Sequence, residues 1–185
     1  MTAPMRMRTR GYLPHYEGGT LIQHVIFRVA DALPPEAETA VFDDERARFI
    51  AVERWLDAGH GSCPLAQGPA ADAVLDTLKF FHGDRYALHA FVVMPSHVHV
   101  LIQPLNDHTL SRILFSWKSF TAKRINALLG LSGRVWHREW YDRFIRDAQH
   151  YDNTWRYIER NPVAAGLAAT AEDWPWSSAH EGWTQ

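Results

Sequence analysis

Two apolar segments separated by only three residues constrain the fold of this chain more than any other feature. RYALHAFVV (85–93) and HVHVLIQ (97–103) are rich in the β-branched and aromatic residues that favour strands. Met94, Pro95 and Ser96 join the two segments. Parallel strands need a crossover connection of about a dozen residues or more, so the short link predicts an antiparallel hairpin.

Hydrophobic periodicity predicts one further strand and four helices. A strand is expected at 20–29, and helices are expected at 40–57, 70–81, 109–129 and about 148–161, where Pro162 ends the last helix. The segment 131–146 is expected to be irregular. The order β-α-α-β-β-α-α predicts an α+β fold, a ferredoxin-like antiparallel sheet with helices packed on one face.

The length and composition suit one globular domain over residues 1–185, with 46% of the residues hydrophobic. We expect a basic N-terminal arm over about residues 1–18 and a C-terminal tail over about residues 168–185. No apolar run approaches the roughly 18 residues that span a membrane, and the N-terminus lacks the apolar stretch of a secretory signal. Cys63 is the only cysteine, which excludes an intramolecular disulfide and a multi-cysteine zinc site and favours a reducing, cytoplasmic location.

Charge is unevenly distributed, although the formal net charge is only −2. Residues 31–57 carry a net charge of −5, whereas residues 110–146 carry +6. A basic half beside an acidic half is compatible with a polyanion bound on one face of the protein. A basic helix face that is simply solvated explains the same charge equally well.

His97 and His99 are the chemically most informative residues of the predicted hairpin. Residues two apart in a strand point to the same face, so the imidazoles lie about 7 Å apart along the chain and can bind one divalent ion. They supply only two ligands, and a third has to come from another segment. Two alternatives remain open. One is a pair of histidines satisfied by hydrogen bonds, and the other is a nucleotide hydrolase of the histidine-triad type, which Leu101 in the third motif position disfavours.

The last predicted helix, within HYDNTWRYIERNP (150–162), places a phenol and an amide on one face. Tyr157 and Asn161 are four residues apart and are therefore neighbours on the helix surface. A tyrosine on an amphipathic helix is more often a packed aromatic than a nucleophile. The pair is different in kind, because the amide oxygen of Asn161 could complete a metal site one turn from the phenol.

Together these motifs resemble the REP-associated tyrosine transposases, a group of single-strand DNA endonucleases of the HUH type with one catalytic tyrosine. The resemblance rests on the order and spacing of several segments along most of the chain. The segments are GYLPHY (11–16), FRVAD (27–31), RYALHAFVVMPSHVHVLI (85–102), SWKSFTAKRIN (116–126), VWHREWYDRFIRD (135–147), YIERNPVAAGL (157–167) and WPWSSA (174–179).

The resemblance implies a role for each residue that matches the family motifs. His97 and His99 would be the two metal ligands of the HUH motif, and Asn161 would help to hold the metal. Tyr157 would attack a DNA phosphate, leaving a 5′-phosphotyrosine and a free 3′-OH. Ser96 departs from the asparagine that family members usually have before the first histidine. Because Ser96 is not a ligand, we expect the chemistry to be unchanged.

The function that the resemblance implies is a Mg²⁺- or Mn²⁺-dependent endonuclease and strand transferase that nicks and rejoins hairpin-containing repetitive DNA. Its partner would be single-stranded DNA with a palindromic hairpin, bound by a monomer or a homodimer. Its location would be the cytoplasm, at the nucleoid, with no membrane association. The alternative is a DNA-hairpin-binding protein of the same fold that does not cleave.

Basic and aromatic residues supply candidates for DNA binding. The helix at 109–129 and the segment after it combine positive charge with Trp136 and Trp140, which suits stacking on unpaired bases as well as core packing. In the family that the chain resembles, the segment around GYLPHY helps to read a short sequence beside the hairpin. The candidate DNA contacts are Arg10, Gly11, Tyr12, Arg112, Lys118, Lys123, Arg124, Arg134, Arg138 and Arg143.

Overall fold

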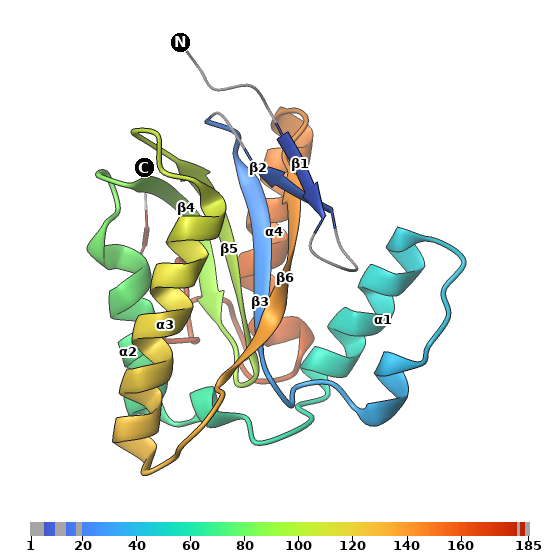
Figure 1. The fold of residues 1–185 in the computed structure, drawn as a ribbon, viewed down its shortest axis with the longest axis vertical. Helices are drawn as coiled ribbons and strands as arrows, with labels where there is room; N and C mark the ends of the chain where they lie inside the picture. The colour runs from blue at the N-terminus through green and yellow to red at the C-terminus, as the bar shows by residue number, and fades with distance from the viewer. Residues whose placement is uncertain (1–5, 10–13, 18–19, 181, 184–185) are drawn as a thin grey trace.

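The computed structural model describes residues 6–9, 14–17, 20–180 and 182–183, and it confirms the predicted α+β class (Figure 1). A central sheet has four strands, all antiparallel, in the order β4–β5–β3–β6. A separate two-stranded sheet pairs β1 (Arg6–Thr9) with β2 (Pro14–Glu17). The other elements are β3 (Gln23–Val29), α1 (Glu45–Asp57), α2 (Gly68–Phe80), β4 (Tyr86–Val93), β5 (His97–Pro104), α3 (Leu110–Leu129), β6 (Trp136–Phe144) and α4 (Ala148–Ala164). Short 3-10 turns lie at Pro35–Glu38 and Pro64–Ala66. In the described part of the chain, no helix is long and apolar enough to cross a membrane.

The predicted hairpin is confirmed as the pair β4 and β5. Val93 lies opposite Val98 in the antiparallel ladder. The Met94 N–H donates to the His97 carbonyl oxygen across the turn at 2.8 Å. β3 pairs with the other side of β5, so β5 is a central strand with hydrogen-bonded neighbours on both sides. Side chains on a central strand are held in fixed directions, which suits a site that needs precise geometry.

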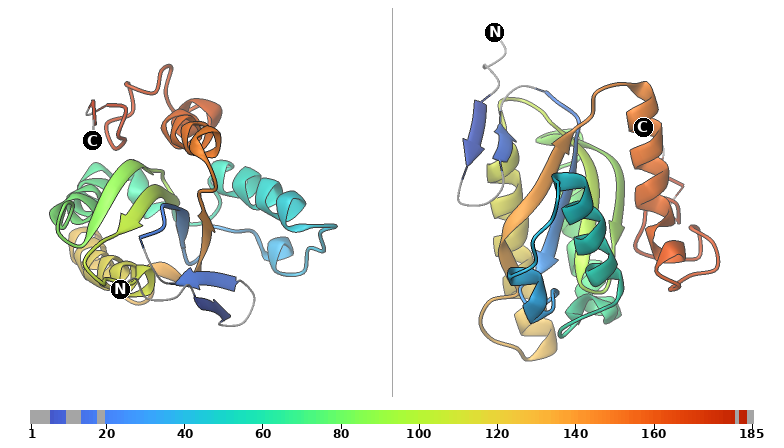
Figure 2. Two further views of the ribbon diagram at one scale, coloured as in Figure 1. Left: turned by 90° about the horizontal axis from the view of Figure 1, so that it is seen from above. Right: turned by 90° about the vertical axis from the view of Figure 1, so that its right-hand side faces the viewer.

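Helices cover both faces of the sheet, so the expectation that they pack on one face alone is not met. α2 and α3 cover one face, and their apolar side chains form the main core with strand residues such as Phe27 and Val100. α4 covers the opposite face, where Ile158 joins a smaller cluster with Val92 and Leu101. The edge-on view in Figure 2 places α3 and α4 on opposite sides of the sheet. Helical periodicity shows which side of a helix is buried, but it does not show which sheet face that helix covers.

β6 corrects the expectation of an irregular segment at 131–146. Trp136–Phe144 pair with β3 and form one edge of the sheet. Trp136 packs in the core with 4% of its surface exposed, and its Nε1 donates to the Thr121 hydroxyl at 2.9 Å. Trp136 is therefore a core residue and not a residue that stacks on bases. Exposed charged residues on the same strand weaken its apolar alternation, which is common in edge strands.

The helix boundaries differ from the expected ones at two ends. α1 begins at Glu45 and not at residue 40, because Asp44 caps it and accepts a hydrogen bond from the Ala47 N–H at 2.7 Å. α4 continues through Pro162 to Ala164. Only two helical residues follow Pro162, so its missing N–H interrupts the backbone hydrogen bonds only near the end of the helix.

The C-terminal segment packs along the outer edge of β4. The Val93 N–H donates to the Trp176 carbonyl oxygen at 2.8 Å. The Ser178 hydroxyl, which is buried, donates to a carboxylate oxygen of Glu159 on α4 at 3.0 Å. The segment thus covers a sheet edge that would otherwise expose unpaired backbone groups, and it connects that edge to α4.

Candidate active site

β5 carries the two histidines on one face of the sheet and aliphatic residues on the other. Val98, Val100 and Ile102 are fully buried in the core beneath α2 and α3. His97 and His99 point to the opposite face, where their ring centroids are 4.8 Å apart. The predicted division of this strand into an apolar face and a histidine face is therefore confirmed. Both histidines are buried, with 1% and 0% of their surface exposed.

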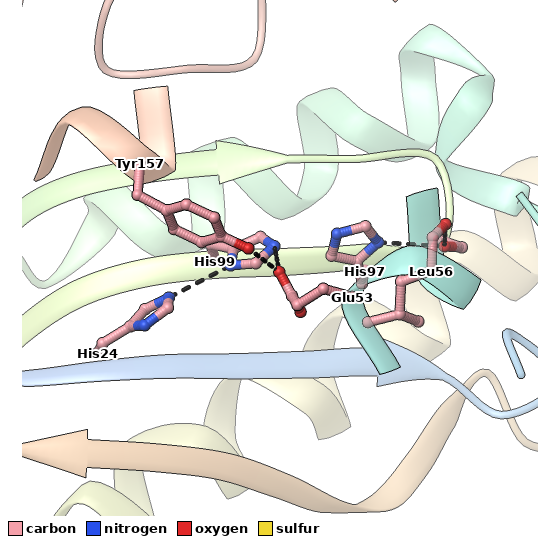
Figure 3. Close-up of polar contacts among 7 residues, drawn as sticks. His24, Glu53, Leu56, His97, His99 and Tyr157 are labelled. Atoms are coloured by element: carbon pink, nitrogen blue, oxygen red, sulfur yellow. Dashed lines mark hydrogen bonds and ion pairs between the residues drawn. The ribbon is translucent and has the colours of Figure 1, made fainter. Parts of the chain in front are cut away.

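The Nδ1 atom of each histidine has a hydrogen-bond partner (Figure 3). The Ser96 hydroxyl donates to the Leu56 carbonyl oxygen at 3.3 Å, so it accepts from His97 Nδ1 at 3.1 Å. His99 Nδ1 lies 3.2 Å from Nε2 of His24 on β3. The Nε2 atoms of His97 and His99 are buried, and no described residue forms a hydrogen bond with them. Buried polar atoms nearly always have a hydrogen-bond partner, so two buried nitrogens without one on the same face indicate a place for a ligand.

Burial keeps these histidines neutral. It lowers the pKa of His97 to about 3 and that of His24 to about 3, and it lowers the pKa of His99 well below its ordinary value. A neutral imidazole has a lone pair on one ring nitrogen, which is the form that binds a metal ion. With Ser96 as the acceptor at Nδ1, His97 has its lone pair on Nε2, whereas the contact of His99 Nδ1 with His24 Nε2 is compatible with either tautomer of His99.

Tyr157 projects from α4 toward the histidines of its own chain (Figure 3). Its ring centroid is 5.8 Å from that of His99, and its hydroxyl donates a hydrogen bond to Oε2 of Glu53. The same carboxylate oxygen lies 3.6 Å from His99 Nε2. The tyrosine remains 38% exposed, so its ring borders solvent while its hydroxyl points inward. Burial, and next the negative charge of Glu53, raise the pKa of Tyr157 well above its ordinary value.

Asn161 lies one helical turn after Tyr157 and is almost fully buried, with 2% of its surface exposed. Its Oδ1 atom has no hydrogen-bond partner among the described residues. Two imidazole nitrogens and an amide oxygen form an intermediate donor set, because imidazole is typical of transition metals and the amide oxygen is typical of Mg²⁺ and Mn²⁺. Within the described ranges, no three His, Cys, Asp or Glu side chains are grouped so that they could hold a metal. The three donor atoms of the predicted set, His97 Nε2, His99 Nε2 and Asn161 Oδ1, are all buried without a hydrogen-bond partner in the described part of the chain.

Glu53 and Asp57 on α1 are site residues that the sequence did not reveal. Glu53 is 7% exposed, and burial raises its pKa to about 7. Burial also raises the pKa of Asp57, one turn later on the helix. One oxygen of each carboxylate is buried without a hydrogen-bond partner in the described part of the chain. The sequence signal is that Glu53 shares the apolar side of α1 with Phe49 and Leu56, where a carboxylate is unusual.

A family model described as "Transposase IS200 like" matches residues 77–161, a segment that contains His97, His99, Tyr157 and Asn161. The matched segment is slightly less than half of the chain. A curated protein of Haemophilus influenzae, provisionally named a REP-associated tyrosine transposase, is 32% identical over 101 residues. The resemblance to the REP-associated tyrosine transposases is confirmed.

The similarities cover different shares of the chains that are compared. The alignment with the Haemophilus influenzae protein covers 49% of this chain and 57% of that relative, so the chain matches little more than half of the relative's length. A solved structure of a REP-associated tyrosine transposase bound to a REP hairpin has a TM-score of 0.57 and 19% sequence identity. That likeness covers 92% of this chain and 84% of the other, and at this identity it shows a shared fold.

The candidate DNA contacts do not form one surface. In the β3–β6 ladder Arg143 lies opposite His24, so it is an exposed cation on the sheet face that carries His97 and His99. α3 covers the other face and carries four of the candidates, Arg112, Lys118, Lys123 and Arg124.

The other candidates lie near the edge strand β6 or outside the described residues. Lys118 donates to the Arg138 carbonyl oxygen at 2.9 Å, and burial lowers the pKa of this lysine to about 8. Arg134 and Arg138 are exposed before and on β6. Arg10, Gly11 and Tyr12 lie outside the described residues.

Proposed function

We propose that this chain is a metal-dependent single-strand DNA endonuclease and strand transferase that nicks and rejoins hairpin-containing repetitive DNA. One observation carries the proposal. The Tyr157 hydroxyl donates to Glu53 beside His99, on the same face as two buried histidine Nε2 atoms that have no hydrogen-bond partner among the described residues. A nucleophile next to a bound metal ion is an arrangement suited to phosphoryl transfer through a covalent intermediate.

His97, His99 and Asn161 would hold the ion through Nε2, Nε2 and Oδ1. A bound Mg²⁺ or Mn²⁺ supplies positive charge to the oxygens of the scissile phosphate and to the ionised phenol. Ser96 and His24 act behind the histidines: the hydrogen bond from His97 Nδ1 to Ser96 keeps a lone pair on His97 Nε2, and His24 contacts His99 at Nδ1.

The bond changes follow from a tyrosine nucleophile. The Tyr157 oxygen forms a bond to phosphorus while the bond from phosphorus to the 3′-oxygen breaks, which leaves a 5′-phosphotyrosine and a free 3′-OH. The number of phosphodiester bonds is conserved, so a 3′-OH can reverse the step and rejoin a strand without ATP. Because Tyr157 contacts the histidines of its own chain, a monomer is sufficient for this chemistry in our proposal.

Single-stranded DNA beside a palindromic hairpin is the proposed substrate, which would bring the protein to the nucleoid. Two observations support it: Arg143 is exposed on the site face, and the related transposase of similar fold was solved with a REP hairpin. A cation beside the site can contact a phosphate next to the one that reacts.

The decisive test incubates the protein with Mn²⁺ and a labelled single-stranded oligonucleotide that carries a REP hairpin, and then looks for a protein–DNA adduct that resists SDS. Wild-type protein is expected to form the adduct, and Tyr157→Phe is expected to form none. Tyr151→Phe is the matched control on the same helix, because the Tyr151 hydroxyl contacts His89 at 3.0 Å and not the site. Adducts formed by Tyr157→Phe would contradict the proposal, and hairpin binding by the wild type without any adduct would support the non-cleaving alternative.

The metal part of the proposal has a separate test. The double variant His97→Ala/His99→Ala is expected to lose both adduct formation and the rise in melting temperature that Mn²⁺ causes in the wild type, because a ligand that binds the folded state stabilises it. Cleavage by this variant at the wild-type rate would remove the metal from the mechanism.

A further inference from the structure

A buried carboxylate outside the family motif contacts the reacting hydroxyl. Glu53 is on α1, whereas Tyr157 is on α4, and the hydrogen bond between them joins two helices that are 104 residues apart in the chain. The tyrosine hydroxyl is the donor and Oε2 of Glu53 is the acceptor. Glu53 faces the histidines as well, with Oε2 at 3.6 Å from His99 Nε2. No motif in the transposase segment 77–161 includes this residue.

The position of Glu53 is fixed by the packing of its helix. Leu56, one turn later on α1, is 2% exposed and packs in the main core. The Leu56 carbonyl oxygen also accepts the hydrogen bond of Ser96 beside His97. Phe49, one turn earlier, lies 6.4 Å from the Tyr157 ring between centroids. α1 therefore holds the carboxylate against the tyrosine through contacts on both sides of Glu53.

We propose that Glu53 is the catalytic base that takes the proton of Tyr157 when the tyrosine attacks the DNA phosphate. The inference rests on the proposed function. A protonated phenol is a poor nucleophile, and an adjacent base within hydrogen-bond reach is the usual means of activating such a group. Glu53 meets the geometric requirement directly, because it already accepts the hydrogen bond whose proton has to leave.

Proton transfer to Glu53 accompanies the attack of the tyrosine oxygen on phosphorus. The O–H bond of Tyr157 breaks and its proton passes to Oε2 of Glu53, while the tyrosine oxygen forms a bond to phosphorus. The bond from phosphorus to the 3′-oxygen breaks, and that oxygen takes a proton from water. In the rejoining reaction the 3′-OH loses its proton to solvent as its oxygen attacks phosphorus, the bond from phosphorus to the tyrosine oxygen breaks, and Glu53 returns its proton to that oxygen.

The first test is Glu53→Gln, because glutamine keeps the size of the side chain and can accept the hydrogen bond but cannot take the proton. We expect the single-turnover rate of adduct formation to fall by about 100-fold or more, the usual contribution of general base catalysis. The affinities for the hairpin oligonucleotide and for Mn²⁺ are expected to stay within about twofold. Glu45→Gln is the matched control on an exposed position of the same helix and is expected to react at the wild-type rate.

A second measurement separates a base from a residue that only supports the fold. Replacement of Tyr157 by 3-fluorotyrosine gives a more acidic phenol, which depends less on a base. The fluorinated tyrosine is expected to raise the rate of the Glu53→Gln protein several-fold more than it raises the wild-type rate. Glu53→Asp retains a proton acceptor and is expected to react faster than Glu53→Gln; it replaces Glu53→Gln in the fluorotyrosine comparison if circular dichroism shows that the glutamine variant is unfolded.

The outcomes distinguish the inference from the proposed function. If wild-type protein forms no adduct, the proposed function itself fails. If the wild type reacts and Glu53→Gln reacts equally fast, the base is not Glu53. A loss of Mn²⁺ affinity in proportion to the loss of rate would make Glu53 a metal ligand and overturn its role as base. An equal effect of 3-fluorotyrosine in both backgrounds would also overturn it.

Discussion

The side chains on the two faces of β5 are equally buried, but different kinds of side chain pack against each face. Val98, Val100 and Ile102 are fully buried against α2 and α3, whose facing side chains are apolar. His97 and His99 are buried to the same degree. They face α1 and α4, which present a carboxylate, a phenol and an amide. Burial alone therefore does not distinguish core from site; the distinction lies in buried polar atoms whose partners are missing.

This difference has opposite effects on stability. Each apolar side chain buried between β5 and the helices stabilises the fold by about 1.5–3 kcal/mol. A buried polar atom without a hydrogen bond costs about 1–3 kcal/mol. The site face is thus held in a form that the rest of the fold has to stabilise, which is common where a ligand completes the structure.

The largest effect is expected on the apolar face. Ile102→Ala removes a fully buried side chain from the core under α2 and α3 and is expected to lower the free energy of unfolding by about 2–5 kcal/mol. The site lies on the other face, so the adduct yield per folded molecule should stay unchanged below the melting temperature. Urea denaturation and adduct formation measure the two quantities. A loss of activity in fully folded protein would show that the two faces are not independent.

An intermediate effect is expected when a hydrogen bond that orients one of the histidines is removed. Ser96→Ala removes the acceptor of the His97 Nδ1 hydrogen bond. The imidazole of His97 can then adopt either tautomer, one of which has a proton and no lone pair on Nε2. The affinity for Mn²⁺ is expected to fall by about 10- to 100-fold, the usual cost of losing a hydrogen bond behind a metal ligand. Calorimetric titration with Mn²⁺ measures this loss. Unchanged affinity would mean that Ser96 only shapes the turn between β4 and β5.

The smallest effect is expected when a single cation is replaced on one face of the sheet or on the other. Arg143→Gln, on the site face, is expected to weaken binding of the hairpin oligonucleotide a few-fold and to reduce the salt dependence of log K by about 0.7. Lys123→Gln, on α3 across the sheet, is the matched control and should leave both quantities unchanged. Fluorescence anisotropy over a range of salt concentrations measures both. Equal losses from the two variants would show that the DNA contacts both faces.

The sequence predicted the histidine face well because its signal is local. Alternation along one strand and a three-residue link are enough to place His97 and His99 on one face of a hairpin. The spacing of Tyr157 and Asn161 likewise determines that they share one side of α4. Local periodicity determines directions along a single element, and those predictions agree with the fold.

The sequence failed where the answer depends on how elements pack against each other. In the sequence Glu53 contributes only to the net negative charge of residues 31–57, and only the packing of α1 beside β5 brings it to the tyrosine. α3 lies across the sheet from the site, so the expected contact of Lys123 with DNA stays a prediction. β6 was missed because exposed charges such as Arg143 interrupt its apolar pattern.

The measurement that tests the central claim most directly identifies the residue that becomes linked to DNA. Wild-type protein is reacted with Mn²⁺ and the hairpin oligonucleotide, the adduct is digested with nuclease and protease, and mass spectrometry locates the modified peptide. The account predicts a nucleotide attached through its 5′-phosphate to Tyr157. Attachment to Tyr141 or Tyr151, or no covalent product at all, would contradict it.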